Sequence, residues 1–394
     1  MTPRAGDRPL SIALVGTRGV PARYGGFETA VEEVGRRLAE RGHRVRVYCR
    51  SGNFDEAMAS YRGMSLVTLP AARRRSLETL THTGLSVAHL ATHRTDVAIV
   101  FNAANAPWLP VLRAARIPVA THVDGLEWRR AKWGPMGRRY YRWAEQRSVR
   151  QSDALIADAQ GIADYYDEEF GAPTTLLAYG APLLDDVGSD RLGELDLAAR
   201  GYHLVVARFE PENHVAEIVE GYAASPARLP LVVVGSAPYA QEYVARIGAA
   251  ADQDGRIRLL GGVWDQGLLD QLYRNAATYL HGHSVGGTNP SLLRAIGAGA
   301  AVIAFDVAFN REVLGAAGTY FRGADEVGDL VVAAEADPRA LDGRRRLARG
   351  KADGYDWDLV ADGYERLVRD LAARRAPGPQ RRARRLTEDG VLVG

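Results

Sequence analysis

The chain has 394 residues, of which 46% are hydrophobic and 25% charged, a composition that excludes a disordered or fibrous protein. This length exceeds one domain of roughly 150 residues, so two domains are expected. Fifty basic against 48 acidic residues leave a net charge of +2, which provides no overall positive field for binding nucleic acid. The single cysteine, Cys49, excludes an internal disulfide and a multi-cysteine metal site.

No apolar run approaches the ~18–20 residues that are needed to cross a bilayer. The apolar stretch at 10–15 is too short for a secretory signal, and it runs directly into a glycine turn. We therefore expect a cytoplasmic protein whose contact with a membrane, if any, is peripheral and at the inner face.

Strand and helix patterns alternate along the chain, which predicts an α/β fold with parallel sheets. The apolar run SIALVG at 11–16 predicts a buried first strand. Apolar positions at helical spacing over 28–41, followed by Gly42, predict the next helix. Further strands are expected at 45–48, 66–69, 97–101, 119–121 and 154–157.

The same pattern begins again at 202–207, about 190 residues after the first strand, with a helix from residue 215. Two such openings predict two Rossmann-like domains. Further strands of the second domain are expected at 229–235, 257–260, 278–280 and 301–305.

The predicted domains cover residues 1–184 and 192–355, and the polar segment 184–192 is expected to be the hinge between them. A last helical pattern covers 356–373. The tail 374–394 contains six arginines among Pro and Gly and is expected to be disordered.

The loop GTRGVPARYGGFE at 16–28 joins the first buried strand to a helix. Its position points helix-terminal N–H groups at the edge of the sheet, and Gly25 and Gly26 would let a phosphate approach the backbone. Arg18 stands where a dinucleotide fingerprint needs its second glycine, which disfavours an NAD-dependent dehydrogenase. A tight turn with purely conformational glycines is the alternative.

Arg208 follows the second opening strand, in the motif ARFEPEN at 207–213. There its guanidinium could hold a diphosphate bidentately, whereas the alternative is a solvated charge.

The loop HGHSVGGTNPS at 281–291 places paired glycines just before a helix, which again makes a small anion pocket. Asn289 is the expected N-cap and Pro290 the first helical residue. His281 and His283 have no third and fourth ligand at suitable spacing, so no metal site is expected.

Polar side chains follow the strand at 119–121, namely His122, Asp124 and Glu127. We expect them on a loop at the carboxyl edge of the first sheet, where polar residues commonly meet substrate. The alternative is that His122 caps a neighbouring helix and Glu127 is solvated.

The segment 128–150 holds eight basic residues against the single acid Glu145, with aromatic residues interleaved. Such a stretch can lie on an anionic membrane surface, stack on nucleic acid, or form a solvated helix with one packed aromatic side. We expect a peripheral membrane contact.

Four motifs together resemble one bacterial group, the retaining glycosyltransferases of family 4 that include rhamnosyltransferases of surface-polysaccharide assembly. They are GTRGVPARYGGFE, HVDGLEWRRAKWG, ARFEPEN and HGHSVGGTNPSLL. The resemblance runs from about residue 10 to 373. It implies a GT-B fold, in which two Rossmann-like domains face each other across a cleft and the last helix returns to the first domain.

The resemblance also implies that the second domain holds a nucleotide-diphosphate sugar and the first an acceptor. His122 would lie beside the transferred sugar, with Asp124 and Glu127 in the same catalytic region. No bound metal or cofactor is expected, because cationic side chains and helix ends offset the leaving-group charge. The donor-binding residues would be Gly25, Gly26, Arg208, Asn213, Val263, Gly286, Gly287, Thr288, Asn289 and Arg294.

The chain departs from the family pattern at three positions. Asn213 stands where family members usually have a lysine, and Gly286 and Arg294 stand where they have two glutamates. Arginine cannot accept a hydrogen bond from a ribose hydroxyl. Arg294 could turn to the diphosphate and replace the lost cation, could weaken ribose binding, or could point into solvent.

The expected function is transfer of a hexose or deoxyhexose, with rhamnose as one candidate, to a glycan or lipid-linked acceptor with retention of configuration. Two alternatives stay open. The chain could be a non-catalytic GT-B partner of an active glycosyltransferase, as the departures at Asn213 and Arg294 would allow, or a nucleotide-sugar epimerase.

Overall fold

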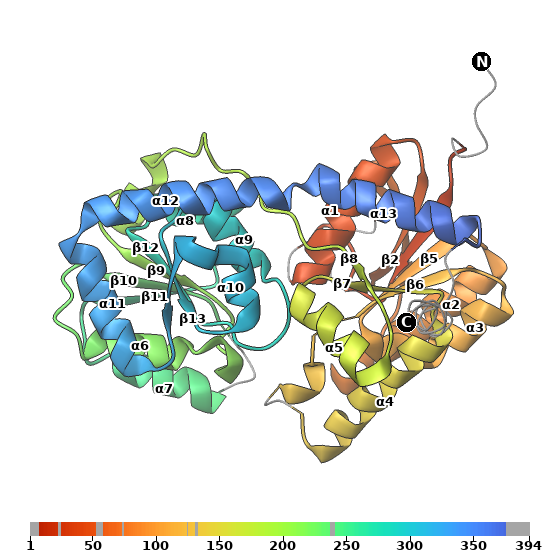
Figure 1. The fold of residues 1–394 in the computed structure, drawn as a ribbon, viewed down its shortest axis with the longest axis horizontal. Helices are drawn as coiled ribbons and strands as arrows, with labels where there is room; N and C mark the ends of the chain where they lie inside the picture. The colour runs from red at the N-terminus through yellow and green to blue at the C-terminus, as the bar shows by residue number, and fades with distance from the viewer. Residues whose placement is uncertain are drawn as a thin grey trace, which may run out of the picture. The chain divides into compact units, whose positions relative to one another are not determined.

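The computed structural model describes residues 8–22, 25–52, 58–72, 75–123, 125–130, 133–236 and 241–375. The chain forms two compact units, and each is an α/β sandwich built on its own sheet (Figure 1). The first unit consists of Met1–Tyr179 with Trp357–Gly394, and the second of Gly180–Asp356. Most of the tail 374–394, for which disorder was expected, lies outside the described residues.

The first unit has an eight-stranded sheet in the order β3-β4-β2-β1-β5-β6-β7-β8. All neighbouring strands are parallel except β3 and β4. The strands are β1 (Ser11–Val15), β2 (Arg44–Arg50), β3 (Ser60–Tyr61), β4 (Met64–Leu69), β5 (Val97–Phe101), β6 (Val119–His122), β7 (Ala154–Ala157) and β8 (Thr175–Leu176). The helices are α1 (Gly26–Glu40), α2 (Arg75–Thr92), α3 (Leu109–Ala114), α4 (Pro135–Gln151), α5 (Gln160–Phe170) and α13 (Trp357–Ala372), with 3₁₀ turns η1 (Ala103–Trp108) and η2 (Glu127–Arg129).

The second unit has a six-stranded parallel sheet in the order β11-β10-β9-β12-β13-β14. The strands are β9 (His203–Val206), β10 (Leu231–Val234), β11 (Ile257–Gly261), β12 (Thr278–His281), β13 (Val302–Phe305) and β14 (Gly318–Phe321). The helices are α6 (Val215–Ala223), α7 (Gln241–Ala251), α8 (Gln266–Asn275), α9 (Pro290–Gly297), α10 (Ala308–Leu314), α11 (Ala324–Ala336) and α12 (Pro338–Ala352). The 3₁₀ turns are η3 (Asp190–Leu195), η4 (Pro211–Asn213), η5 (Gly315–Ala317) and η6 (Asp353–Tyr355).

The central strands are almost entirely apolar because helices cover both faces of each sheet. Every residue of β5 is buried, as is every residue of β10, so neither strand shows the alternation of a half-exposed strand. All strands predicted from apolar runs are present, with ends that differ by at most two residues. The short strands β3, β8 and β14 were not predicted, since they contain few consecutive apolar residues.

The segment 184–192, expected to be a hinge, lies entirely within the second unit. Leu184 N–H donates to the carbonyl of Gly297 at 3.0 Å, and Gln271 Nε2 donates to Asp190 Oδ1 at 2.7 Å. These bonds attach the segment to α9 and α8, so its polar composition reflects a surface position and not a joint between domains.

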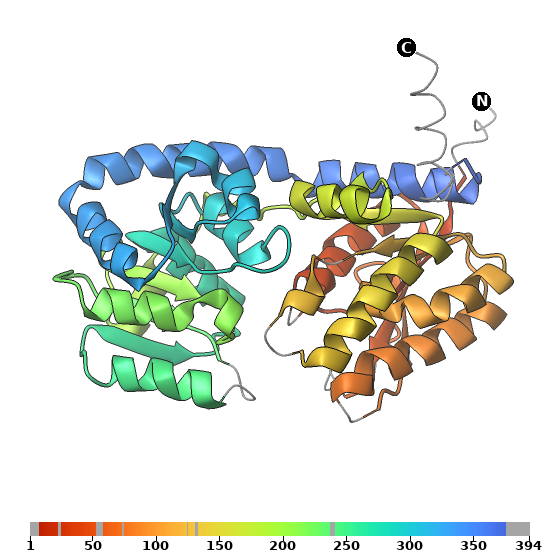
Figure 2. The same ribbon diagram turned by 60° about the horizontal axis from the view of Figure 1, so that its bottom comes forward.

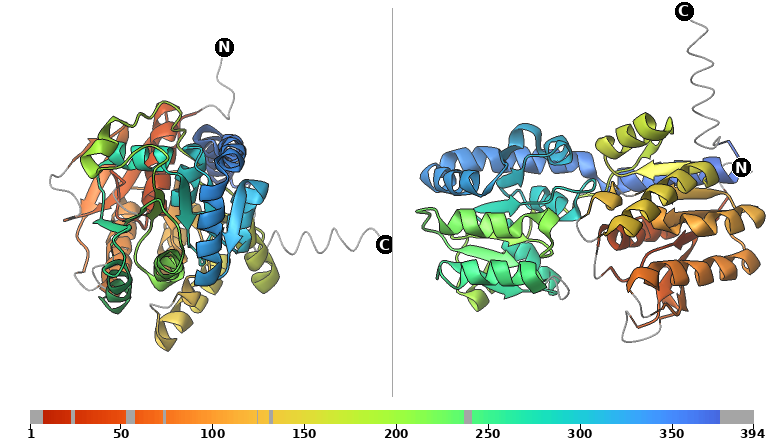
Figure 3. Two further views of the ribbon diagram at one scale, coloured as in Figure 1. Left: turned by 90° about the vertical axis from the view of Figure 1, so that its left-hand side faces the viewer. Right: turned by 90° about the horizontal axis from the view of Figure 1, so that it is seen from below.

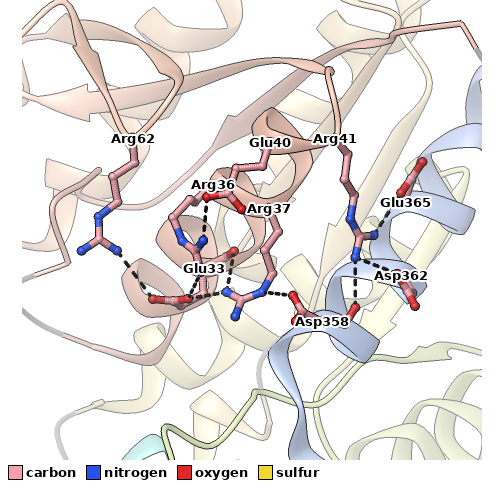
Figure 4. Close-up of polar contacts among 9 residues, drawn as sticks. All are labelled: Glu33, Arg36, Arg37, Glu40, Arg41, Arg62, Asp358, Asp362 and Glu365. Atoms are coloured by element: carbon pink, nitrogen blue, oxygen red, sulfur yellow. Dashed lines mark hydrogen bonds and ion pairs between the residues drawn. The ribbon is translucent and has the colours of Figure 1, made fainter.

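Helix α13 packs against α1, although the two are separated by the entire second unit in the sequence (Figure 1). Arg37 Nε donates to Asp358 at 2.6 Å, and Arg41 pairs with Asp362 and Glu365 at 2.7 and 3.0 Å (Figure 4). We call this set the α1–α13 ion-pair cluster. Because its acids lie on α13 and its arginines at the end of α1 (Arg37) and at the residue that follows it (Arg41), it fixes α13 to the first unit.

Glu365 of this cluster has three partners, namely Arg41, His43 and Arg369. Burial by itself would raise the pKa of Glu365, but hydrogen bonds from Arg369, His43 and Arg41 lower it below the ordinary 4.5. His43 accepts from Leu10 N–H through Nδ1, at 3.0 Å, so its Nε2 carries the proton that faces Glu365.

We expect Glu365→Gln to lower the free energy of unfolding of the first unit by about 1–2 kcal/mol at neutral pH, since three charged or polar donors lose an ionised acceptor. A lowered folded pKa stabilises the protein above the ordinary value and ceases to do so as the pH falls through the folded value. The difference between wild type and variant should therefore shrink below pH 4.5. Urea unfolding across this range measures it. Glu40→Gln, which removes one exposed pair with Arg36, is the control and should cost under about 0.5 kcal/mol.

Candidate functional site

The second unit carries most of the expected donor-binding residues on loops that follow its strands. β9 and β12 are neighbours in the sheet, and parallel strands end at one edge, so the loops after them lie together. Arg208 follows β9, and Gly286 and Gly287 follow β12. Val263 follows β11, which is two strands away from β9. The structure therefore brings Arg208 and the glycine turn together, and places Val263 farther along the same edge.

Side-chain hydrogen bonds connect the loop after β9 to the loop after β12. Asn213 Nδ2 donates to the carbonyl of Arg208 at 2.8 Å, while Asn213 Oδ1 accepts from His283 Nδ1 at 2.8 Å. His214 Nε2 lies 2.9 Å from Ser284 Oγ. The oxygen and nitrogen of the buried Asn213 thus both bond within the protein and hold the carbonyl of Arg208, while its direct contact with a donor stays a prediction.

Gly282 lets the two loops approach closely. A Cβ atom at this position would lie 2.1 Å from the carbonyl oxygen of Asn213, a distance that no side chain can occupy. The loop then turns at Gly286, where φ is +129°, and enters α9. Asn289 caps that helix by accepting from Ser291 N–H at 2.9 Å, and Pro290 is its first residue, as the sequence predicts.

Arg208 presents an accessible positive charge at this edge. Its side chain is 37% exposed, whereas that of its ion-pair partner Glu210, at 3.5 Å, is 7% exposed. The long pair distance and the exposure leave the guanidinium able to bind an anion in addition to Glu210. Thr288, which directly follows the glycine turn, is buried.

Arg294 lies on α9 and pairs with Asp270 on α8. Both side chains are largely buried, so the reading in which Arg294 points into solvent is wrong. Asp270 balances its charge, and a contact between Arg294 and a donor diphosphate, one of the alternatives given above, stays a prediction. A helix-to-helix ion pair explains why an arginine is accommodated there.

In the first unit, Gly25 has φ of +96° and precedes Gly26, the first residue of α1. Glu28 folds back over this turn, where its Oε1 accepts from Arg18 N–H at 3.0 Å. Burial raises the pKa of Glu28, although the hydrogen bond from Arg18 opposes the rise. The carboxyl group of Glu28 therefore lies beside the Gly25 turn, at the start of α1.

His122 is the last residue of β6 and is fully buried, so its expected place on a loop is wrong. Its ring lies among aromatic rings, at centroid distances of 5.3 Å from Phe101, 6.1 Å from Tyr179 and 6.5 Å from Tyr364. Among the described residues neither ring nitrogen has a hydrogen-bond partner, which also excludes a capping role. Burial lowers the pKa of His122 to about 3, so the ring is neutral.

We expect the NMR signals of the His122 ring to stay unchanged between about pH 5 and 8, because its pKa lies far below the ordinary 6.5. The unfolded chain binds a proton near 6.5, so the neutral ring stabilises the fold above that pH, and this contribution is lost as the pH falls. His122→Gln assigns the signal. A titration near 6.5 would instead mean that water reaches the ring.

Comparison with known proteins agrees with this architecture. Residues 25–180 match the family of glycosyl transferase 4-like domains, and residues 201–339 match glycosyl transferases group 1. Sucrose-phosphate synthase from Thermosynechococcus elongatus has a TM-score of 0.80 at 20% identity, over 93% of this chain and 100% of that one. HepE of Anabaena, in complex with UDP-glucose, has a TM-score of 0.73 at 17% identity, over 91% and 99%. The chain has the GT-B fold of glycosyltransferases.

One curated relative also matches part of this GT-B chain. The O-antigen chain mannosyltransferase B of Escherichia coli is 28% identical over 131 residues, which make up 32% of this chain and 34% of that protein. The match thus spans about a third of the relative's length. Among the described helices of the GT-B chain, none is long and apolar enough to span a bilayer.

Of the two carboxylates expected beside His122, the structure describes Glu127 and not Asp124. Asp124 lies outside the described residues. Glu127 lies on η2, largely buried, where it pairs with Arg130 at 2.7 Å and accepts from Trp133 Nε1 at 3.2 Å. The solvated reading of Glu127 is therefore wrong, and these contacts give it a local structural role.

Several residues that shape the GT-B site were not predicted from the sequence. The rings of Tyr179, which follows β8, and of Tyr364, on α13, lie near His122, and both come from segments distant from β6 in the sequence. His283 drew notice only as a possible metal ligand, whereas it holds Asn213. Its position two residues after the end of β12 was the available signal.

Proposed function

We propose that the protein transfers a hexose or deoxyhexose from a nucleotide-diphosphate sugar to a glycan or lipid-linked acceptor, with retention of configuration and in the cytoplasm. The observation that carries the proposal is the joined pair of loops that presents Arg208 beside the Gly286–Gly287 turn and the start of α9. The domain matches and the UDP-glucose complex of HepE support a nucleotide-sugar donor. Rhamnose is one candidate sugar.

The proposed chemistry needs groups that stabilise a leaving diphosphate. Arg208 supplies one positive charge, and the glycine turn with the following helix start supplies backbone N–H groups. We propose that these groups act without a bound metal. We further propose that a diphosphate oxygen takes the acceptor's proton, so that no protein nucleophile is needed.

Calorimetry with UDP, dTDP and GDP, followed by assays with the matching sugar nucleotides, tests the proposal. We expect one diphosphate to bind and its sugar nucleotide to be consumed when an acceptor is present. Absence of any nucleotide binding would favour the non-catalytic partner. Conversion of the donor sugar without an acceptor would favour an epimerase.

We also propose that α4 contributes a peripheral contact with an anionic membrane. Met136 is 88% and Trp143 41% exposed, and Arg139 and Arg150 are exposed on the same helix. The one acid of α4, Glu145, is buried and bonded to Tyr165. Figures 2 and 3 show α2, α3 and α4 side by side, and the neighbouring helices also carry the exposed apolar residues Leu85 and Val111.

The protein should therefore sediment with phosphatidylglycerol vesicles and not with phosphatidylcholine vesicles, with binding that weakens as salt is added. Replacing Arg139 and Arg150 by glutamine should weaken vesicle binding by tenfold or more, because each basic residue near the surface contributes about 1 kcal/mol. Replacing the exposed Arg346 of α12 by glutamine is the control. Equal binding to both vesicle types would contradict the proposal.

A further inference from the structure

The second unit contains a two-part hollow beside its edge strand β14. An open part of about 540 Å³ is lined by the arginines Arg311 and Arg322 and by the carboxylates Asp306, Glu326 and Asp329, and an inner part has a volume of about 300 Å³. Thr319, Leu330 and Arg344 line both parts, so the two are continuous. A volume of about 300 Å³ is at the lower end for small-ligand sites.

The inner part exists because α11 and α12 present small side chains to the sheet. Ala333 and Ala334 at the end of α11 and Ala340 on α12 line it, opposite Val302 and Ile303 of β13. Val302, Ile303 and Ala334 are buried apolar residues. Besides Arg344, the polar side chains of this wall are Thr278, Thr319 and Asp337, and Asp337 accepts from Ala340 N–H at 3.0 Å. The rest of the wall is apolar and suits an alkyl chain better than a sugar or a base.

Arg344 lies where the inner part meets the open part. Its Nη1 donates to the carbonyl of Gly318 at 3.1 Å, and none of the carboxylates in the described part of the chain pairs with it. The other two arginines at the opening, Arg311 and Arg322, both pair with Asp306. Arg344 is therefore the cation that an incoming anion could bind without displacing a carboxylate.

This hollow is separate from the loops that carry the proposed donor site. Its floor includes Thr278, where β12 begins, and Val302, where β13 begins. The glycine turn instead follows the other end of β12, after His281. A ligand in the inner part would contact the amino ends of β12 and β13, whereas the open part extends along β14 to Asp306 and Arg322, which follow the carboxyl ends of β13 and β14.

We propose that the hollow binds a small amphipathic anion, with its alkyl chain in the inner part and its carboxylate or phosphate on Arg344. Burial of the chain supplies the apolar contribution to binding, and the charge-assisted bond to Arg344 fixes the orientation. The proposal is independent of the transferase function, since none of the donor-loop residues lines the hollow.

Calorimetry on the full chain with octanoate and octyl phosphate tests the site. At least one of the two should bind saturably, and which of them binds more tightly identifies the head group. Octanol, which lacks the charge, and acetate, which lacks the chain, should each bind at least tenfold more weakly than that anion. Equal binding of octanol and octanoate would overturn the role of Arg344, and saturable binding of neither anion would overturn the site.

Two variants separate the contributions of chain and charge. Arg344→Gln should weaken binding of the anion tenfold or more and leave octanol unchanged, whereas Ala334→Leu fills the inner part and should abolish binding of both. Arg346→Gln and Ala336→Leu, at exposed positions of the same two helices that do not line the hollow, are the controls. Circular dichroism checks that each variant is folded. Unchanged binding in a folded Arg344→Gln would overturn the proposal.

Discussion

Replacement of Arg208 by alanine is expected to lower kcat/KM for the donor by about 10²–10³-fold. The reason is that a positioned donor facing charge that develops on the leaving group is worth roughly 3–4 kcal/mol in a site shielded from water. Arg208 has the exposure needed for that role, and its backbone carbonyl is held by Asn213. The loss should appear in both kcat and the affinity for the nucleoside diphosphate, which steady-state kinetics and calorimetry measure separately.

Arg228→Ala is the matched control for Arg208→Ala, because Arg228 is exposed and lies in the same unit, away from the loops after β9 and β12. It should leave both quantities unchanged. Full diphosphate affinity in Arg208→Ala would place the donor elsewhere. Arg208→Lys should recover part of the affinity, since lysine keeps the charge but not the bidentate geometry.

Gly282→Ala is expected to damage stability and donor binding together. The new Cβ would lie 2.1 Å from the carbonyl oxygen of Asn213, and the opposing atom is backbone, which cannot rotate away. Overpacking of this kind costs about 1–3 kcal/mol, and here it must separate the loop carrying Arg208 from the loop carrying Gly286. We expect a lower unfolding free energy of the second unit and at least a tenfold loss of diphosphate affinity.

Gly248→Ala provides the control for Gly282→Ala. Gly248 is on α7, where an added Cβ would meet nothing within 4 Å, so alanine should stabilise the helix by up to about 1 kcal/mol. Urea unfolding and calorimetry on the two variants side by side distinguish a local clash from a general effect of replacing glycine. A Gly282→Ala protein with wild-type stability and affinity would mean that the two loops are not in close contact.

The fold was largely predictable because the strands of a parallel sheet covered on both faces are continuous apolar runs in the sequence. β5 and β10 are continuous apolar runs, and Gly42 and Asn289 mark helix ends in the expected way. The segment 184–192 was misread because surface segments and linkers have the same composition. Its hydrogen bonds to α8 and α9 depend on partners about 80 to 110 residues away.

The sequence predicted which loops form the candidate site, but it did not predict the contacts of the individual side chains. Arg208 and the glycine turn are where strand order places them. The ion pairs of Arg294 with Asp270 and of Glu127 with Arg130 were not predicted, because the alternatives considered for each side chain were a ligand or water. The placement of His122 on a loop was wrong because the strand continues one residue beyond its predicted end, and the ring lies in an aromatic cluster.

The return of α13 to the first unit has a consequence for synthesis. The ribosome completes all of Gly180–Asp356 before it makes the 16 residues of α13. Until then Arg37 and Arg41 have no acidic partners from α13, and the ring of His122 lacks its neighbour Tyr364. The first unit, most of which is synthesised first, is thus the last to reach its final structure.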